Sequence, residues 1–225
     1  MSTRALLRCG VVAGPFFILA VLVQDYTRPG FDPRRHALSL LSLGDLGWIQ
    51  IATFVTTGLL YAAGALGLRR ALRPGPAGTW GPLLIGTFGL GLVGAGAFPT
   101  APGWGYPQGA PPGVPVDTSV SHVLHGVSFF VVLISLVAAC FVFARGWAAR
   151  GARGWTIFCV VVGTALPVIY VLAGVLSDRG ADPQPFSLLL RTLALTGWSW
   201  ASLVTLRVMN MAADGHLRAD HARNP

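Results

Sequence analysis

The feature that most constrains this chain is a series of six apolar stretches, each long enough to cross a lipid bilayer. A helix rises about 1.5 Å per residue and the hydrocarbon layer is about 30 Å thick, so a span needs roughly 20 mostly apolar residues. The stretches that qualify are 6–24, 47–68, 80–98, 119–144, 154–176 and 187–208. The sequence therefore predicts an all-α, six-helix transmembrane domain over residues 1–208, followed by a flexible cytoplasmic tail over 209–225.

The composition agrees with a membrane protein. Hydrophobic residues make up 53% of the chain and charged residues 11%, whereas a soluble domain carries about a quarter charged residues. This balance excludes a disordered chain and argues against an ordinary water-soluble enzyme.

The placement of arginine predicts the orientation of the bundle. Because six spans return the chain to its starting side, the N-terminus, the loops 69–79 and 145–153 and the tail share one side of the membrane. That side holds most of the 16 basic residues, all of which are arginine. The positive-inside rule then places both termini in the cytoplasm, in a multi-pass protein of the cell membrane. We expect membrane lipids as partners and no nucleic acid, since the high pI reflects this asymmetry.

Two external connections carry structural signals of their own. Asp32 is a good N-cap, Pro33 suits the first helical position and Gly44 suits a stop, so the first external loop is predicted to contain a short helix. We interpret it as an amphipathic helix in the outer headgroup layer or as a lid over a cavity between the spans. The second external loop, 99–117, is rich in proline and glycine and predicts a semi-rigid cover.

Small residues predict where the helices touch, because membrane helices associate by close packing. Gly10 and Gly14 lie one turn apart in the first span. In the third span the glycines scatter around the helix, which predicts that this helix lies in the middle of the bundle. These glycines are Gly81, Gly86, Gly89, Gly91, Gly94 and Gly96.

Polar side chains within the spans gather toward the external side of the predicted bundle. One face of the second span carries Gln50, Thr53, Thr57 and Tyr61. Those expected in the outer half are Gln50, Thr53, His122, His125, Tyr170, Arg191 and Thr192. Two interpretations fit the pattern: hydrogen bonds that hold the helices together, or a polar, His-containing pocket open to the outer leaflet.

The leading functional hypothesis is an intramembrane enzyme that acts by acid–base chemistry on a lipid or isoprenoid-like amphiphile. His125 is the predicted acid or base and His122 its neighbour, because imidazoles titrate near neutral pH. The predicted orienting carboxylates are Asp32 and Asp117. The predicted substrate contacts are Arg35 and Arg191, for an anionic headgroup, together with His36, Gln50 and Tyr170.

A metal site is a weaker interpretation. A catalytic zinc ion has three protein ligands and one open position. His122 and His125 supply two ligands, and the third would have to come from His36, Asp32 or Asp117. We therefore predict no metal, and the sequence indicates no particular cofactor or oligomeric state.

Two other classes of function remain. The first is a non-enzymatic binder of a hydrophobic ligand, or an accessory or scaffold subunit, which needs only the helix packing described above. The second is a transporter or channel, which ranks last because the chain shows no inverted repeat and no charged pathway through its inner half.

Several motifs are similar to those of a known family. They are the run from Arg28 to Ser39 (RPGFDPRRHALS), Gly47-Trp48-Ile49-Gln50, Phe98-Pro99-Thr100-Ala101-Pro102, Tyr106-Pro107 and Leu124-His125. On these motifs the chain resembles, over about residues 5–208, a family of small bacterial membrane proteins, domain of unknown function 998, abundant in actinobacteria. The resemblance implies a multi-span helical fold and points to Asp32, Arg35, His36, Ser39 and His125. Members often carry acidic residues where this chain has Ala101 and Gly126, which implies an altered activity here if those acids serve one.

Overall fold

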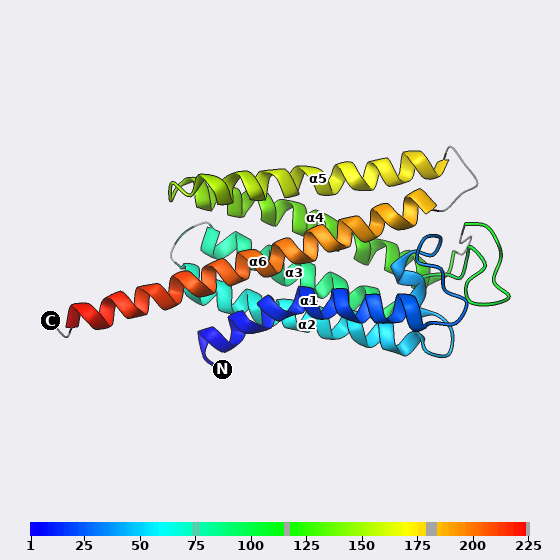
Figure 1. Ribbon diagram of the computed structural model, residues 1–225, viewed down its shortest axis with the longest axis horizontal. Coiled ribbons are helices and arrows are strands. Elements are labelled where there is room, and N and C mark those ends of the chain that lie inside the picture. Colours follow the sequence, from blue (N-terminus) through cyan, green and yellow to red (C-terminus); the bar gives the residue numbers. More distant parts are fainter. Residues whose placement is uncertain (74, 76, 115–117, 179–183, 224–225) are drawn as a thin grey trace.

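The regular elements of the computed structural model are helices. It describes all residues except 74, 76, 115–117, 179–183 and 224–225, and for 216–223 it describes the backbone alone. The elements are α1 (Thr3–Thr27), the 3-10 helix η1 (Leu38–Ser42), α2 (Gly47–Leu72), α3 (Ala77–Ala97), α4 (Val120–Ala148), α5 (Arg153–Asp178) and α6 (Gln184–Arg223). The α-helices lie side by side along the long axis of the molecule (Figure 1). The predicted all-α class is confirmed.

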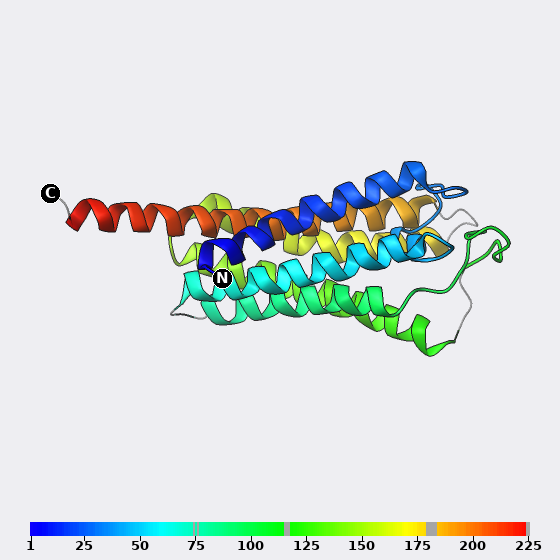
Figure 2. The same ribbon diagram turned by 90° about the horizontal axis from the view of Figure 1, so that it is seen from below.

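Five of the predicted spans, α1 to α5, are helices long and apolar enough to cross a membrane. The sixth helix, α6, is not among these five, although it runs beside α1 and α5 through the bundle. It is 40 residues long and continues past the predicted end at residue 208, so its last turns project beyond the other helices (Figure 2). Residues 209–223, expected to form a loose tail, therefore have a helical backbone.

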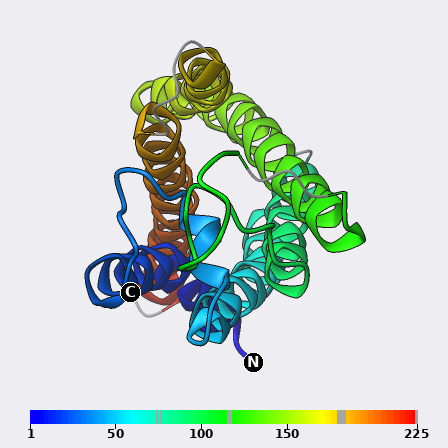
Figure 3. The ribbon, with the colours of Figure 1, turned by 90° about the vertical axis from the view of Figure 1, so that its right-hand side faces the viewer.

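The six α-helices form a closed ring. Each packs against the next one in the sequence, and α6 packs against α1, so the first and last helices are neighbours (Figure 3). The prediction that α3 lies in the middle of the bundle is wrong, because α3 is a member of the ring and packs mainly against α2 and α4. Its glycines point to several sides because the helix has two neighbours.

Glycines mark the closest helix crossings. Gly58 of α2 and Gly89 of α3 face each other so closely that a Cβ on either would meet the other's backbone oxygen. Gly91 faces α4, where a Cβ would meet the Val132 side chain at 2.8 Å. On α1, Gly10 lies against Gly64 of α2, where a Cβ on Gly64 would come within 2.7 Å of the Gly10 Cα. Small residues thus set the helix spacing, as the sequence predicted.

A buried hydroxyl group joins α6 to α1 midway along the bundle. The Ser202 hydroxyl accepts a hydrogen bond from the Gly14 N–H (3.1 Å) and donates one to the Gly10 carbonyl (3.1 Å). Beside it, the Tyr61 hydroxyl of α2 donates to the Trp198 carbonyl of α6 (2.9 Å). We call this group of five residues the serine bridge. It connects three helices through groups that have no water to bond with in a bilayer.

The connection 28–46 and the described parts of the connection 98–119, residues 98–114 and 118–119, cover one end of the ring, which we call the loop end (Figures 1 and 3). The start of α1 and the last turns of α6 lie at the opposite end (Figure 1).

The short helix predicted in the first loop is found in part, as a five-residue 3-10 helix that begins after the turn at Asp32. Asp32 does cap a turn, since its Oδ1 accepts from the Arg34 N–H (2.9 Å), but that turn does not continue as an α-helix. The chain instead forms η1, in which Leu40, Leu41 and Ser42 are buried. Because these side chains pack into the protein, the loop lies over the end of the bundle, in agreement with the alternative interpretation as a lid.

The described part of the second loop, residues 99–114, crosses over the end of the ring (Figure 3). Its backbone is tied to itself, since the Trp104 N–H donates to the Gly113 carbonyl and the Gly105 N–H to the Pro111 carbonyl. This segment agrees with the predicted cover.

Candidate functional site

The polar residues of the loop end separate into two groups on different sides of the ring. The first, which we call the arginine cluster, joins α1, α2, α6 and the first loop. Its members are Gln24, Asp25, Arg28, His36, Gln50 and Arg191. The second is the histidine pair, His122 and His125 of α4, which bonds to the segment that follows α3.

Arg191 is the centre of the arginine cluster. Its Nη1 donates to Asp25 Oδ2 at 2.7 Å, in an ion pair whose side chains are 13% and 5% exposed. Its Nε donates to the Pro33 carbonyl (2.9 Å) and its Nη2 to the His36 carbonyl (3.0 Å). The buried hydroxyl of Ser187, one turn away, lies within hydrogen-bond distance of the same two carbonyls and shares its one proton between them. Arg191 therefore holds the first loop to α1 and α6, and its guanidinium is already engaged within the protein.

His36 joins the two loops. Its Nδ1 accepts from the Asp32 N–H (2.9 Å), so in the neutral ring Nε2 carries the proton and donates to the Trp104 carbonyl (3.1 Å). The ring is also in contact with Phe31 and Tyr106. Burial lowers the pKa of His36 below its ordinary value, against the opposing effects of the Trp104 carbonyl and the Asp32 charge. The predicted substrate contact is thus a neutral side chain that pins one loop to the other.

A chain of two side-chain hydrogen bonds through Gln24 connects α1 to α2. Arg28 Nη2 donates to Gln24 Oε1 (2.7 Å), and Gln24 Nε2 donates to Gln50 Oε1 (2.8 Å). All three side chains are buried. Three atoms of the arginine cluster are buried without a hydrogen-bond partner: Asp25 Oδ1, Arg28 Nη1 and Gln50 Nε2.

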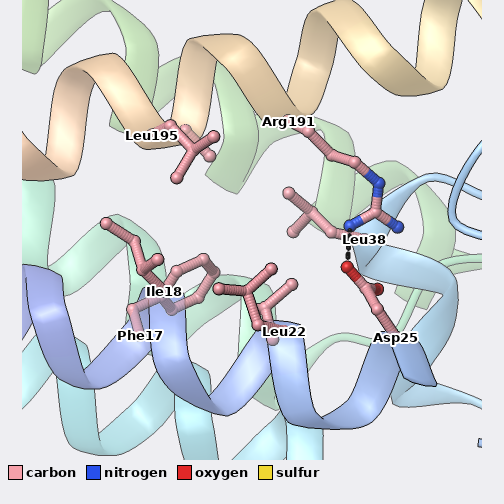
Figure 4. Close-up of a pocket in the computed structure, with 9 residues that line it drawn as sticks. Phe17, Ile18, Leu22, Asp25, Leu38, Arg191 and Leu195 are labelled. Carbon is pink, nitrogen blue, oxygen red and sulfur yellow. Dashed lines mark hydrogen bonds and ion pairs between the residues drawn. The ribbon is translucent and has the colours of Figure 1, made fainter.

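A groove of about 80 Å³ lies between α1 and α6 and ends at the arginine cluster (Figure 4). Its walls include Ile18 and Leu22 of α1 and Leu195 of α6, and Asp25 and Arg191 meet at one end. Apolar surface makes up nearly all of the lining. The groove is therefore apolar along its walls and has an ion pair at one end.

The histidine pair is bound to the backbone that leaves α3. His125 Nδ1 lies 2.8 Å from the Phe98 carbonyl, and because a carbonyl only accepts, Nδ1 carries the proton. His122 Nδ1 accepts from the Ala101 N–H (3.2 Å), with the Thr100 hydroxyl at 3.4 Å, so its proton is on Nε2. In the neutral state the two rings therefore have opposite tautomers, with Nε2 a donor on His122 and an acceptor on His125.

The structure separates the predicted catalytic residues. Asp32 lies with His36 on the first loop, where its carboxylate caps a turn. Asp117 lies outside the described residues. The acid–base set predicted from the sequence is thus reduced, in the described residues, to His122 and His125.

The predicted substrate contacts are divided as well. Gln50, His36 and Arg191 belong to the arginine cluster. Arg35 is exposed on the first loop. Tyr170 of α5 packs its ring against Phe129 and Phe130 of α4, away from that cluster. Thr192 is exposed, and its hydroxyl bonds to its own helix at the Leu188 carbonyl.

Among the described residues no group of three His, Cys, Asp or Glu side chains is close enough together to hold a metal ion. Neither Asp32 nor His36 joins the histidine pair, and a third ligand for His122 and His125 is therefore not supplied by the residues described.

Sequence reasoning missed Gln24, Arg28, Ser187 and Ser202. Gln24 and Arg28 stand at the end of the first span, where polar residues are ordinary, and Ser187 and Ser202 are small residues of a mixed helix. One signal was available: positions 17, 21, 24 and 28 follow a helical spacing, so a buried stripe on α1 ends in Gln24 and Arg28.

The fold and the two polar groups define a multi-pass helical membrane protein with a ring of helices capped by two loops. The sequence model of the family described as "Protein of unknown function (DUF998)" matches residues 11–207, and the chain belongs to this family. No match was found among curated proteins or among solved structures.

Proposed function

We propose that this protein binds the chain of a lipid-like amphiphile in the groove between α1 and α6, with its loop end facing the outside of the cell membrane. The observation that carries this proposal is the groove itself, which is apolar along its length and closed at one end by the Asp25–Arg191 pair. The proposed role is binding without catalysis, because the ionisable residues that line the groove, Asp25 and Arg191, are paired with each other.

The opening of the groove favours a ligand from the bilayer. Leu22 is 44% exposed and Leu195 is 48% exposed, so the walls reach the surface that lipid tails would cover. From Phe17 to Asp25 the groove follows α1 for about 12 Å. This length and the small volume fit part of one hydrocarbon chain and exclude a whole lipid.

The polar end favours a ligand whose head lies near the interface. Asp25 and Arg191 neutralise each other, so the end of the groove carries no net charge that would repel an apolar chain. Because helix ends of a span lie near the headgroups, a chain in the groove has its head at the loop end.

The test is to fill the groove with a larger side chain. Leu22→Trp should reduce the lipid that co-purifies with the protein in mild detergent, as counted by native mass spectrometry. Leu19→Trp is the matched control, because Leu19 is a 62% exposed leucine of the same helix that does not line the groove. Equal lipid occupancy in both variants would contradict the proposal.

A second candidate is an enzyme that uses the histidine pair. It is favoured by the opposite tautomers, because a donor Nε2 on His122 and an acceptor Nε2 on His125 are the two ends of a proton transfer. Lipid extracts from cells with and without the protein should then differ in at least one species. If His125→Ala leaves that difference intact, the histidine pair is not catalytic.

A further inference from the structure

Among the residues that the structure describes, Arg28 is a buried cation without a counter-ion. Its side chain is at the end of α1 and the residue is 7% exposed. The ion pair found among the described residues joins Arg191 to Asp25, and no carboxylate within the described part of the chain pairs with Arg28. Its Nη2 donates to Gln24 Oε1, but its Nη1 is buried without a partner. A buried charge of this kind is strongly unfavourable unless something compensates it.

A second donor without a partner stands on the same network. Gln50 is fully buried, its Oε1 accepts from Gln24, and its Nε2 has no partner. The orientation of the Gln24 amide is fixed, because its Nε2 also donates to the Ala20 carbonyl (3.1 Å). The hydrogen bonds from Arg28 to Gln50 thus use both amide oxygens and leave two NH2 groups, Arg28 Nη1 and Gln50 Nε2, without an acceptor.

The two unpartnered nitrogens lack hydrogen-bond acceptors, and Arg28 also lacks a negative charge to compensate its own. Asp25 does not supply that charge, since Arg191 holds its Oδ2, and its unpartnered Oδ1 lies beyond ion-pair distance of Arg28. Phosphate and carboxylate oxygens accept charge-assisted hydrogen bonds from guanidinium and amide N–H groups.

We propose that Arg28 and Gln50 form an anion site beneath the first loop, which takes the phosphate or carboxylate group of a ligand. This goes beyond the proposed function, because the site faces α2 through Gln24 and does not line the groove between α1 and α6. Both donors are closed off from solvent, so binding an anion requires a rearrangement of the residues around them.

The test uses the full-length protein in neutral detergent. Inorganic phosphate is the probe for a free anion, with sodium chloride of equal ionic strength as the control for screening. Lysophosphatidic acid is the probe for a headgroup, with monoacylglycerol as its uncharged control. The midpoint of thermal unfolding should rise with phosphate if a free anion suffices, or with lysophosphatidic acid alone if the anion must be part of an amphiphile.

Two variants and a control identify the site. Arg28→Gln should weaken the response to the effective probe roughly 10- to 100-fold. Gln24→Glu places a carboxylate beside Arg28, so it should raise the unfolding midpoint without ligand and abolish the response. Arg34→Gln removes the same charge from an exposed position of the same loop and should leave the response unchanged.

Two results would overturn the proposal. The first is a thermal unfolding midpoint of the wild type that neither phosphate nor lysophosphatidic acid raises. In that case the unpartnered donors bind water and no anion. The second is an undiminished response in both Arg28→Gln and Gln24→Glu. If Arg28→Gln does not fold, Gln24→Glu decides alone, because it keeps the arginine and adds the charge that the site lacks.

Discussion

The two halves of the ring are held together in different ways. In the half formed by α1, α2 and α6, side chains bond from one helix to another, as Ser202 does to Gly14 and Arg191 to Asp25. In the half formed by α3, α4 and α5, hydroxyl groups such as those of Ser135 and Thr164 bond to carbonyls of their own helix. Away from the loop end, where α4 bonds to the segment after α3, the helices of this half meet through glycines and apolar side chains.

This difference indicates which kinds of substitution each half of the ring tolerates. A hydrogen bond between helices fixes both distance and direction, and in a bilayer a lost partner is not replaced by water. The first half should therefore be sensitive to single-atom changes, and the second to changes of volume. Four predictions test this contrast, from the largest expected effect to the smallest.

Removing Arg191 should have the largest effect. Arg191→Met leaves the buried Asp25 carboxylate unpaired, together with the carbonyls of Pro33 and His36, and should lower the free energy of unfolding by about 3–5 kcal/mol. The measurement is thermal or denaturant unfolding in detergent. Thr192→Val, at the next position of the same helix, should have little effect because that side chain is exposed.

A methyl group at Gly14 should be the next most damaging change. The Cβ of Gly14→Ala would lie 2.6 Å from the Trp198 carbonyl oxygen and 2.7 Å from Ser202 Oγ, so α1 and α6 must separate. We expect a loss of roughly 2–3 kcal/mol in the free energy of unfolding. Gly174→Ala of α5 is the control, since a Cβ there meets nothing within 4 Å. Equal losses in the two variants would show that the loss at Gly14 does not come from its contact with α6.

Two serine substitutions compare the halves directly. Ser202→Ala removes the hydroxyl that bridges Gly14 and Gly10, and should reduce the free energy of unfolding by about 1–2 kcal/mol. Ser135→Ala removes a buried hydroxyl that bonds within α4, and should change it by less than about 0.5 kcal/mol. Unfolding of both variants in the same detergent measures the difference. A larger loss for Ser135→Ala would contradict it.

The smallest effect concerns pH. Burial lowers the pKa of His36 in the folded protein, so the unfolded chain binds the proton more readily, and stability falls as the pH drops below about 6.5. Gln offers an acceptor to the Asp32 N–H and a donor to the Trp104 carbonyl without titrating. The unfolding midpoint of His36→Gln should therefore fall less than that of the wild type between pH 7.5 and 5.5. Parallel curves would assign the acid sensitivity to other groups.

The sequence predicted the helices well because each span is a local property. Length and apolarity are enough to place α1 to α5, and the stripe of Gln50, Thr53, Thr57 and Tyr61 is buried as a whole. The spacing on one helix face shows that such residues turn inward.

The partners of those residues depend on which helices are neighbours, and the local sequence pattern does not determine the order of the helices. The serine bridge joins Gly14 to Ser202 across 188 residues of chain. The polar residues were expected to share one pocket, but ring order places His125 beside α3 and Arg191 beside α1. A common depth in the membrane does not imply a common site.

Closure of the ring by its first and last helices has a consequence for biosynthesis. The carboxylate of Asp25 is translated with α1, whereas its guanidinium partner on α6 follows 166 residues later. Until then α1 carries an unmatched acid and a broken backbone hydrogen-bond ladder next to Pro15. Ribosome-bound or truncated chains that end before α6 should therefore be recognisable to the insertion and degradation machinery as unfinished, by an acid whose partner Arg191 lies on α6.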